Sequence, residues 1–137
     1  MATFGEKINL LRRLIDKGSK DVSIRSLAGS LGGITNTFNF VKSRVAFEEE
    51  PVGEDNFQYP TFTLKAGRGD CEDHCGLLGS LLKAQGYDVR LKVIPRGERY
   101  HVYPLVKSPY GWIPLDTTIN KPMGSEVSGI WQKIYPV

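Results

Sequence analysis

The first 45 residues place apolar positions at the spacing of α-helices. Residues 5–17 predict an amphipathic helix that ends near Gly18, and its apolar side consists of Ile8, Leu11, Leu14 and Ile15. A second helix is predicted over residues 24–31, followed by a break at Gly32 and the next glycine, and a third over about residues 35–44. The first third of the chain is therefore expected to be helical.

Residues 46–66 interrupt this pattern with two prolines, a glycine and several acids, which favours a loop-rich crossing of the surface. A longer helix is then predicted to begin near Cys71 and to end near Gly86. The apolar stripe of this helix consists of Cys71, Cys75, Leu78 and Leu82. Leu77 and Leu81 lie beside the stripe.

Three β-like runs follow, at residues 89–94, 100–107 and 112–116. The turn Ser-Pro-Tyr-Gly at residues 108–111 joins the last two runs as an antiparallel hairpin. No element is predicted after Thr118. Helices combined with a small antiparallel sheet predict an α+β fold.

Size, charge and cysteine content narrow the class of protein. A chain of 137 residues, 40% hydrophobic and 24% charged, suits one globular domain. The formal net charge of +3 is dispersed and no apolar run could span a bilayer, so neither nucleic acid nor a membrane is an expected partner. Cys71 and Cys75 are one helical turn apart, which excludes a disulfide scaffold. We expect a soluble protein in the cytoplasm of the producing cell.

Cys71 has the position of an activated thiol. The N–H groups and the positive dipole end of a helix N-terminus stabilise a thiolate. Asp70 suits the N-cap and Asp73 the third helical position, but both negative charges disfavour the thiolate. A cationic partner is therefore needed, and His101 is the candidate because an imidazole can accept the thiol proton.

The hairpin supplies a third member of this site. A chain that reverses at about Pro109 to Tyr110 places residues near His101 opposite residues near 116–118, so Asp116 can reach the far nitrogen of the ring. That carboxylate would set the tautomer of the imidazole and stabilise the imidazolium. The candidate catalytic residues are Cys71 as nucleophile, His101 as base and Asp116 as orienter.

Three segments resemble the core of the transglutaminase-like superfamily, which has a papain-like Cys-His-Asp site: GDCEDHCGLLGSLLKAQGYDVRLKVI, HVYPLV and GWIPLD. The segment FQYPTFTLKAGRGDCED makes the chain most similar to short single-domain forms encoded by tailed phages. By this likeness the motif residues take the three roles assigned above. The likeness implies one domain, with residues 1–33 as an N-terminal helical extension, residues 34–118 as the core and residues 119–137 as a C-terminal segment.

The resemblance implies acyl transfer through a thioester between Cys71 and a protein or peptide substrate, without a metal or other cofactor. Water as the acceptor gives peptide or isopeptide hydrolysis, and a lysine amine gives cross-linking. Hydrolysis is favoured because a minimal domain has little structure with which to exclude water. The backbone N–H of Cys71 and the side chain of Gln58 could stabilise the oxyanion, although Gln58 could equally be a surface amide. Trp112 could wall the cleft or fill the hairpin.

Other interpretations stay open. A phage structural or assembly protein could keep the fold without catalysis and bind virion proteins, because fold does not determine function. A cell-wall peptidase that acts after lysis fits the resemblance, but no wall-binding module is recognised. A zinc site could use Cys71, Cys75 and His74 or His101, but a second ligand pair is missing. The superfamily usually has a small apolar residue in place of Cys75 and an aromatic or aliphatic one in place of His74, whose role the sequence leaves unassigned.

Overall fold

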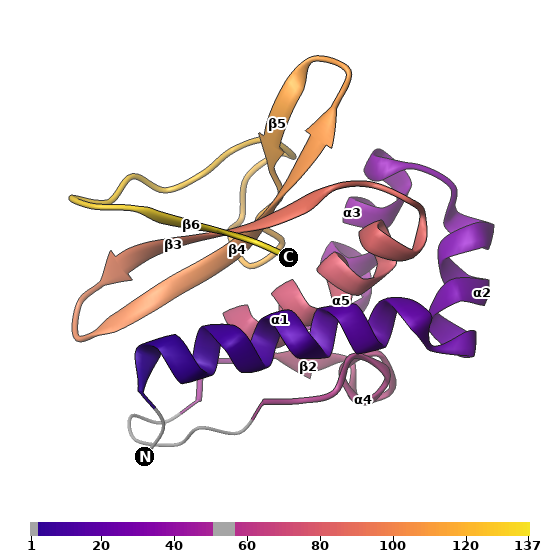
Figure 1. Cartoon of the computed structure of the whole chain (residues 1–137), viewed down its shortest axis with the longest axis horizontal. Helices are drawn as coiled ribbons and strands as arrows, with labels where there is room; N and C mark the ends of the chain where they lie inside the picture. The colour runs from indigo at the N-terminus through magenta and orange to yellow at the C-terminus, as the bar shows by residue number, and fades with distance from the viewer. Residues whose placement is uncertain (1–2, 51–56) are drawn as a thin grey trace.

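The computed structural model describes residues 3–50 and 57–137, in which helices pack against one side of a small twisted sheet (Figure 1). The helices are α1 (Phe4–Lys20), α2 (Val22–Leu31), α3 (Ile34–Arg44), α4 (Pro60–Ala66) and α5 (Cys71–Ala84). The strands are β1 (Ala46–Phe47), β2 (Arg68–Gly69), β3 (Val89–Arg96), β4 (Arg99–Ser108), β5 (Gly111–Pro114) and β6 (Lys133–Pro136). The predicted α+β class is confirmed.

Helix α5 is the centre of the molecule, in contact with all four other helices and with β2, β3 and β4. Its leucines at positions 77, 78, 81 and 82 are fully buried, as their spacing predicted. The helix begins at the predicted residue and ends at Ala84, with Gln85 as its C-cap, before Gly86 turns the chain with a φ of 92°. The sheet and α1 to α4 together bury α5 on most of its sides.

Helix α1 extends beyond its predicted end at Gly18. Gly18 is a packing position inside the helix, because a Cβ atom there would lie 2.4 Å from Ser80 Oγ on α5. The helix continues to Lys20, and Asp21 then caps α2 by accepting a hydrogen bond from the backbone N–H of Ser23 at 2.9 Å. Burial of Ile8, Leu11 and Ile15 confirms the apolar side of α1.

Residues 46–50 and 57–66, the described parts of the predicted loop, contain a helix and a short strand. Their last seven residues form α4, which starts with Pro60 in its first turn and ends at Gly67, where φ is 71°. At the other end, β1 pairs in parallel with β2, so Ala46 lies opposite Arg68. Proline suits the first turn of a helix because its missing N–H would be unpaired there. Residues 51–56, which carry the other predicted loop signals, lie outside the described part.

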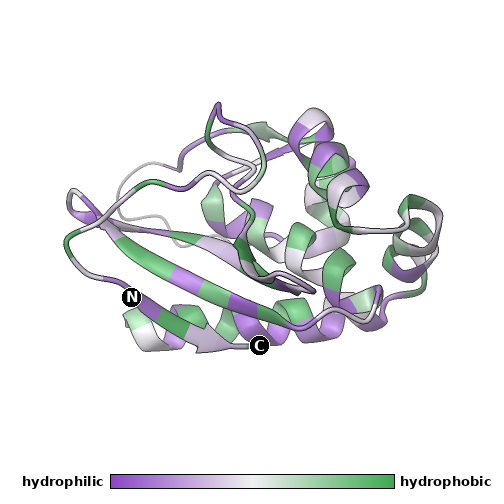
Figure 2. Cartoon of the chain, turned by 90° about the horizontal axis from the view of Figure 1, so that it is seen from above, coloured by the Kyte–Doolittle hydropathy of each residue, from purple (hydrophilic) through white to green (hydrophobic). Residues whose placement is uncertain are grey.

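The four-stranded sheet has the order β5-β4-β3-β6, with every neighbouring pair antiparallel. The predicted hairpin is confirmed, since Ser108 lies opposite Gly111. Figure 2 shows β3 alternating between hydrophobic and hydrophilic residues, as expected of a strand with one face against the helices. Strand β6 was not predicted; it is four residues long and ends in a proline, a local pattern that does not indicate a strand by itself.

None of the helices in residues 3–50 and 57–137 combines the length and apolar character required to cross a membrane.

Candidate active site

The helix that carries Cys71 begins with two mutually bonded acids. Asp70 is the N-cap of α5, and its side chain accepts a hydrogen bond from the backbone N–H of Asp73 at 3.0 Å. Asp73 in return accepts a hydrogen bond from the N–H of Asp70 at 3.1 Å. This capping box satisfies two backbone donors that a helix start leaves unpaired, and it holds Cys71 as the first helical residue. The predicted capping roles of both acids are confirmed.

His101 on β4 and Asp116, two residues beyond β5, form a buried pair. His101 Nε2 lies 2.6 Å from Asp116 Oδ2, and the two side chains are 4% and 1% exposed. Asp116 Oδ1 accepts two more hydrogen bonds, from the backbone N–H and the hydroxyl of Thr118, at 3.0 and 2.6 Å. Burial opposes ionisation, but these hydrogen bonds and the charge of the imidazole hold the pKa of Asp116 below its ordinary value. Asp116 is therefore a carboxylate at neutral pH.

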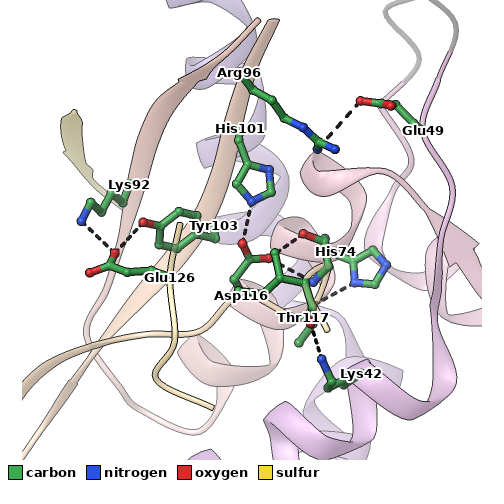
Figure 3. A network of polar contacts seen from close by, with 12 residues as sticks. Lys42, Glu49, His74, Lys92, Arg96, His101, Tyr103, Asp116, Thr117 and Glu126 are labelled. Carbon is green, nitrogen blue, oxygen red and sulfur yellow. Dashed lines mark hydrogen bonds and ion pairs between the residues drawn. The ribbon is translucent and has the colours of Figure 1, made fainter. Parts of the chain in front are cut away.

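The hydrogen bond to Asp116 determines which nitrogen of His101 can act as a base. A carboxylate only accepts, so Nε2 carries the proton of the neutral ring and Nδ1 carries the lone pair. His101 Nδ1 is buried and has no hydrogen-bond partner among the described residues. The ring is thus held from one side by Asp116 and keeps an unused proton acceptor on the other (Figure 3).

The Cys71 thiol is near β4, because the backbone N–H of Val102, the residue that follows His101, contributes to its pKa. Burial raises the pKa of the Cys71 thiol above its ordinary value and three nearby carboxylates raise it further, whereas the Val102 N–H lowers it. Burial and these carboxylates thus disfavour the thiolate, which needs positive charge beside it to form.

Glu72 adds one of these carboxylates directly after Cys71. Tyr100 donates a hydrogen bond from its hydroxyl to Glu72 Oε2 at 2.9 Å. Burial and the charge of Asp70 raise the pKa of Glu72 to about 8, although the bond from Tyr100 opposes the shift. The Glu72 side chain therefore titrates in the neutral range, close to the candidate nucleophile.

His74, to which the sequence assigned no role, connects α5 to two segments that are distant along the chain. Its Nδ1 lies 2.8 Å from the Thr117 hydroxyl, and its Nε2 lies 3.3 Å from the carbonyl oxygen of Ala46. The carbonyl only accepts, so Nε2 carries the proton and Nδ1 accepts from Thr117. Burial lowers the pKa of His74, which favours this neutral ring. Because Thr117 follows Asp116, His74 holds the backbone that presents the carboxylate (Figure 3).

Lys42 of α3 holds the same segment from another direction. Its ammonium group donates to the carbonyl oxygens of Ile119 and Lys121. No local pattern could have revealed Lys42, because more than seventy residues separate it from its acceptors. Thr118, by contrast, had a local signal: a hydroxyl residue two positions after Asp116 is typical of an aspartate turn.

The two remaining candidates are Gln58, which lies at the start of α5, and Trp112, which lies far along the sheet from His101. The backbone N–H of Gln58 donates to Asp73 Oδ1 at 2.9 Å, so Gln58 lies at the first turn of α5, while its side-chain oxygen accepts from Thr63 at 2.9 Å. Trp112 lies opposite Lys107, six residues along β4 from His101 and therefore about 20 Å away. The hairpin register thus carries Trp112 away from the other candidates, where it packs beside a cluster on the outer face of the sheet.

The cysteines and His74 do not form a metal site. Both nitrogens of His74 are engaged, and Cys75 is 1% exposed within an apolar cluster of α1, β3 and β4. In the part of the chain that the structure describes, no group of three or more His, Cys, Asp and Glu side chains could hold a metal ion. Cys75 is a core residue, in agreement with its place in the apolar stripe.

Comparison with known proteins places the chain in a family. The family model described as the transglutaminase-like superfamily matches residues 23–117, a span that includes Cys71, His101 and Asp116, and the chain belongs to this superfamily. No curated protein matches the chain.

Solved structures share the fold at low identity. A candidate protease from Parabacteroides distasonis has a TM-score of 0.65 at 13% identity, over 81% of this chain and 26% of that one. Calcium-bound LapG from Legionella pneumophila has a TM-score of 0.58 at 17% identity, over 99% and 81% of the two chains. A candidate cysteine protease from Cytophaga hutchinsonii has a TM-score of 0.54 at 13% identity, over 99% and 49%. The chain thus spans about a quarter of the first protein and 65% of the chain in two other LapG structures.

Proposed function

We propose that the protein is a cysteine-dependent acyl-transfer enzyme that hydrolyses a peptide or isopeptide bond. The observation that carries the proposal is the buried Nδ1 of His101, which holds a lone pair and has no partner among the described residues while Asp116 orients the ring. A buried polar atom without a partner is costly, and its retention fits a base that receives a proton during reaction. The fold shared with candidate cysteine proteases supports the same class.

The proposed reaction has two halves. Cys71 Sγ attacks the carbonyl carbon of the substrate as its proton passes to His101 Nδ1, and the imidazolium then protonates the departing amine, which leaves a thioester. In the second half water attacks the thioester carbon, His101 takes a proton from the water, and the proton returns to Cys71 as the acid product leaves. Asp116 stabilises the imidazolium in both halves, and the backbone N–H of Cys71 faces the oxyanion. A lysine amine in place of water would give cross-linking.

The test compares alkylation of Cys71 by iodoacetamide from pH 4 to pH 10 in the wild type and in His101→Ala, followed by mass spectrometry. In the wild type we expect Cys71 to react below the range of a free thiol, about pH 8.5, because the imidazolium offsets the surrounding negative charge. In His101→Ala, burial and the carboxylates raise the pKa of Cys71 without that offset, so reaction should need a more alkaline pH.

Cys75 supplies an internal reference in the same spectra, since it is buried and should react slowly in both proteins. Identical pH profiles for Cys71 in the two proteins would contradict the proposed ion pair. Hydrolysis of a peptide mixture by the wild type, but not by Cys71→Ala, would then show that water can accept the acyl group from the Cys71 thioester.

A non-catalytic role is the second candidate, and one observation favours it: His101 Nδ1 makes no hydrogen bond to the Cys71 thiol. Under this alternative the chain is a phage structural or assembly protein that binds virion proteins. Normal assembly and infectivity of a phage that carries Cys71→Ala would support the binding role, whereas loss of function with an unchanged fold would support catalysis.

Phage origin and the division of the chain are also part of the proposal. The segment FQYPTFTLKAGRGDCED supports a short phage-encoded form, made in the cytoplasm of the producing cell, with residues 1–33 as an extension and residues 119–137 as a C-terminal segment of one domain. Detection of the protein by mass spectrometry in purified virions would support a virion-associated role, and its restriction to the lysate would oppose it.

A further inference from the structure

A cavity of about 170 Å³ lies against the imidazole of His101. It is bounded by β1, by the end of β3 and by the segment that follows Asp116. The residues that line it are Phe47, Ile94, Pro95, Arg96, His101, Thr118, Ile119 and Val127. Cys71 is not among them, so the cavity flanks the candidate base and does not enclose the nucleophile.

The walls of this cavity are mainly apolar. Five of its eight lining residues are hydrophobic, and the one side chain with a permanent charge, Arg96, is paired with Glu49, which it shares with Arg99. The Arg96 guanidinium lies 3.8 Å from Glu49 and stacks over the ring of Phe47 at 5.6 Å. A ligand carboxylate would have to compete with Glu49, whereas an apolar group gains contacts without breaking any.

The outer wall is held in place before any ligand binds. Lys42 fixes the backbone at Ile119 and Lys121 through their carbonyl oxygens. Further along the segment, Glu126 accepts hydrogen bonds from Lys92 at 2.8 Å and from the Tyr103 hydroxyl (Figure 3). These anchors lie within the stretch from Thr118 to Val127 that lines the cavity. The cavity is therefore largely preformed, which lowers the entropic cost of binding.

We propose that this cavity binds one apolar side chain of the peptide substrate, of about the size of leucine or phenylalanine, at a fixed position near the bond that is cleaved. The size follows from volume, because an apolar cavity of about 150 Å³ accepts a benzene-sized group. The position follows from the shared wall, since a side chain in the cavity lies against the His101 ring. This inference rests on the proposed hydrolysis and adds the substrate class to it.

The first test profiles cleavage sites in a peptide mixture by mass spectrometry. The wild type should enrich Leu, Ile, Met or Phe at one fixed position relative to the cleaved bond. Val127→Phe narrows the cavity and should lower kcat/KM for leucine-bearing peptides about tenfold or more relative to alanine-bearing ones. Phe47→Ala widens it and should shift the preference toward larger side chains. Ile130→Phe is the matched control: Ile130 is 95% exposed and lies three residues beyond Val127, outside the cavity.

The second test needs no turnover. Methyl NMR of Ile94, Ile119 and Val127 follows titration with N-acetyl-leucinamide, with N-acetyl-aspartate amide and N-acetyl-glycinamide as controls. Shifts with the leucine compound alone, lost in Val127→Phe and kept in Ile130→Phe, are expected. The absence of shifts in the wild type, or equal shifts with the aspartate compound, would overturn the apolar assignment.

The two tests separate the cavity from the proposed hydrolysis. If no peptide is cleaved but the leucine compound binds, the proposed hydrolysis is contradicted, whereas the proposed binding of an apolar side chain in the cavity is supported. If peptides are cleaved without enrichment at any position, or if Val127→Phe and Ile130→Phe behave alike, the cavity proposal fails and hydrolysis stands.

Discussion

Three carboxylates lie near the Cys71 thiol, and the balance between them and the imidazole proposed as its partner determines whether the thiol ionises. Asp70, Glu72 and Asp116 all raise the pKa of Cys71, in addition to the effect of burial. Asp70 is needed to cap α5 and Asp116 to orient His101. Glu72 has neither duty, and its carboxylate accepts a hydrogen bond from the Tyr100 hydroxyl. The charge of Glu72 can therefore be removed with the least disturbance.

We predict that, in the His101→Ala background, Glu72→Gln lowers the midpoint pH of Cys71 alkylation by about one unit. In that background the thiol ionises above pH 8, where Glu72 is charged, so one nearby negative charge is lost. The glutamine oxygen can still accept the hydrogen bond from Tyr100. Glu98→Gln is the control, since Glu98 is exposed in the turn between β3 and β4. Equal midpoints for the two variants would mean that the charge of Glu72 does not change the pKa of the Cys71 thiol.

The same variant should change the pH dependence of stability. Burial raises the pKa of Glu72 from 4.5 to about 8, so the folded state binds this proton more tightly than the unfolded state. The contribution is fully present below pH 4.5 and is lost as pH rises toward 8. Chemical unfolding between pH 5 and pH 9 should therefore show a smaller alkaline decline in Glu72→Gln than in the wild type.

At the scale of elements, α1 and α5 pack closely because small residues line the contact between them. A Cβ atom at Gly18 would lie 2.4 Å from Ser80 Oγ and 2.9 Å from Pro60 Cγ, and one at Gly79 would lie 2.9 Å from Ile15 Cδ1. Ser80 cannot easily move aside, because its hydroxyl donates to the carbonyl oxygen of Gly76 at 2.6 Å within the core. The contact between these helices therefore depends on glycine on both sides.

We predict that Gly18→Ala destabilises the protein by about 1–3 kcal/mol, because overpacking outweighs the better helix propensity of alanine. Gly29→Ala is the matched control: Gly29 lies inside α2, and a Cβ atom there would have nothing within 4 Å, so alanine should be neutral or stabilise by up to about 1 kcal/mol. Urea unfolding measures both. A Gly18→Ala protein as stable as the wild type would show that the two helices can separate freely.

At the scale of the whole molecule, β6 brings the end of the chain back to cover β3. Lys133 lies opposite Val93 and Pro136 opposite Arg90, so this strand occupies the edge of the sheet beyond β3. Leu91 and Val93 are fully buried on the helix side of β3. Without β6, the backbone donors and acceptors along that edge of β3 would be exposed.

We predict that a chain truncated after Ile130 loses protection of the β3 amides in hydrogen exchange and tends to aggregate through the exposed edge. Ile134→Lys is the control, since it removes a half-exposed apolar side chain but keeps the backbone pairing. Aggregation of Ile134→Lys to the same degree would assign the effect to the side chain. Unchanged exchange in the truncated chain would mean that β6 does not protect β3.

Local pattern was enough for most of the elements and for the contact between His101 and Asp116. Helical spacing predicted the buried leucines of α5, and the turn before Gly111 set the register that brings Asp116 to His101. Both follow from short-range geometry, because side-chain period and hairpin register depend on residues close in sequence. The sequence left Trp112 either as a wall of the cleft or as a filler of the hairpin, and in the structure it packs beside Ile94, Tyr103 and Leu105.

The sequence by itself determined the α+β class, the start of α5 at Cys71 and the pairing of His101 with Asp116. The tertiary structure alone decided that Gly18 is a packing position, that His74 and Lys42 hold the segment after Asp116, that β6 closes the sheet, and that a cavity lies beside His101. The physical reason is the range of the interactions. Periodicity and turns act between neighbours, whereas close packing, buried hydrogen bonds and cavities join residues that only the folded chain brings together.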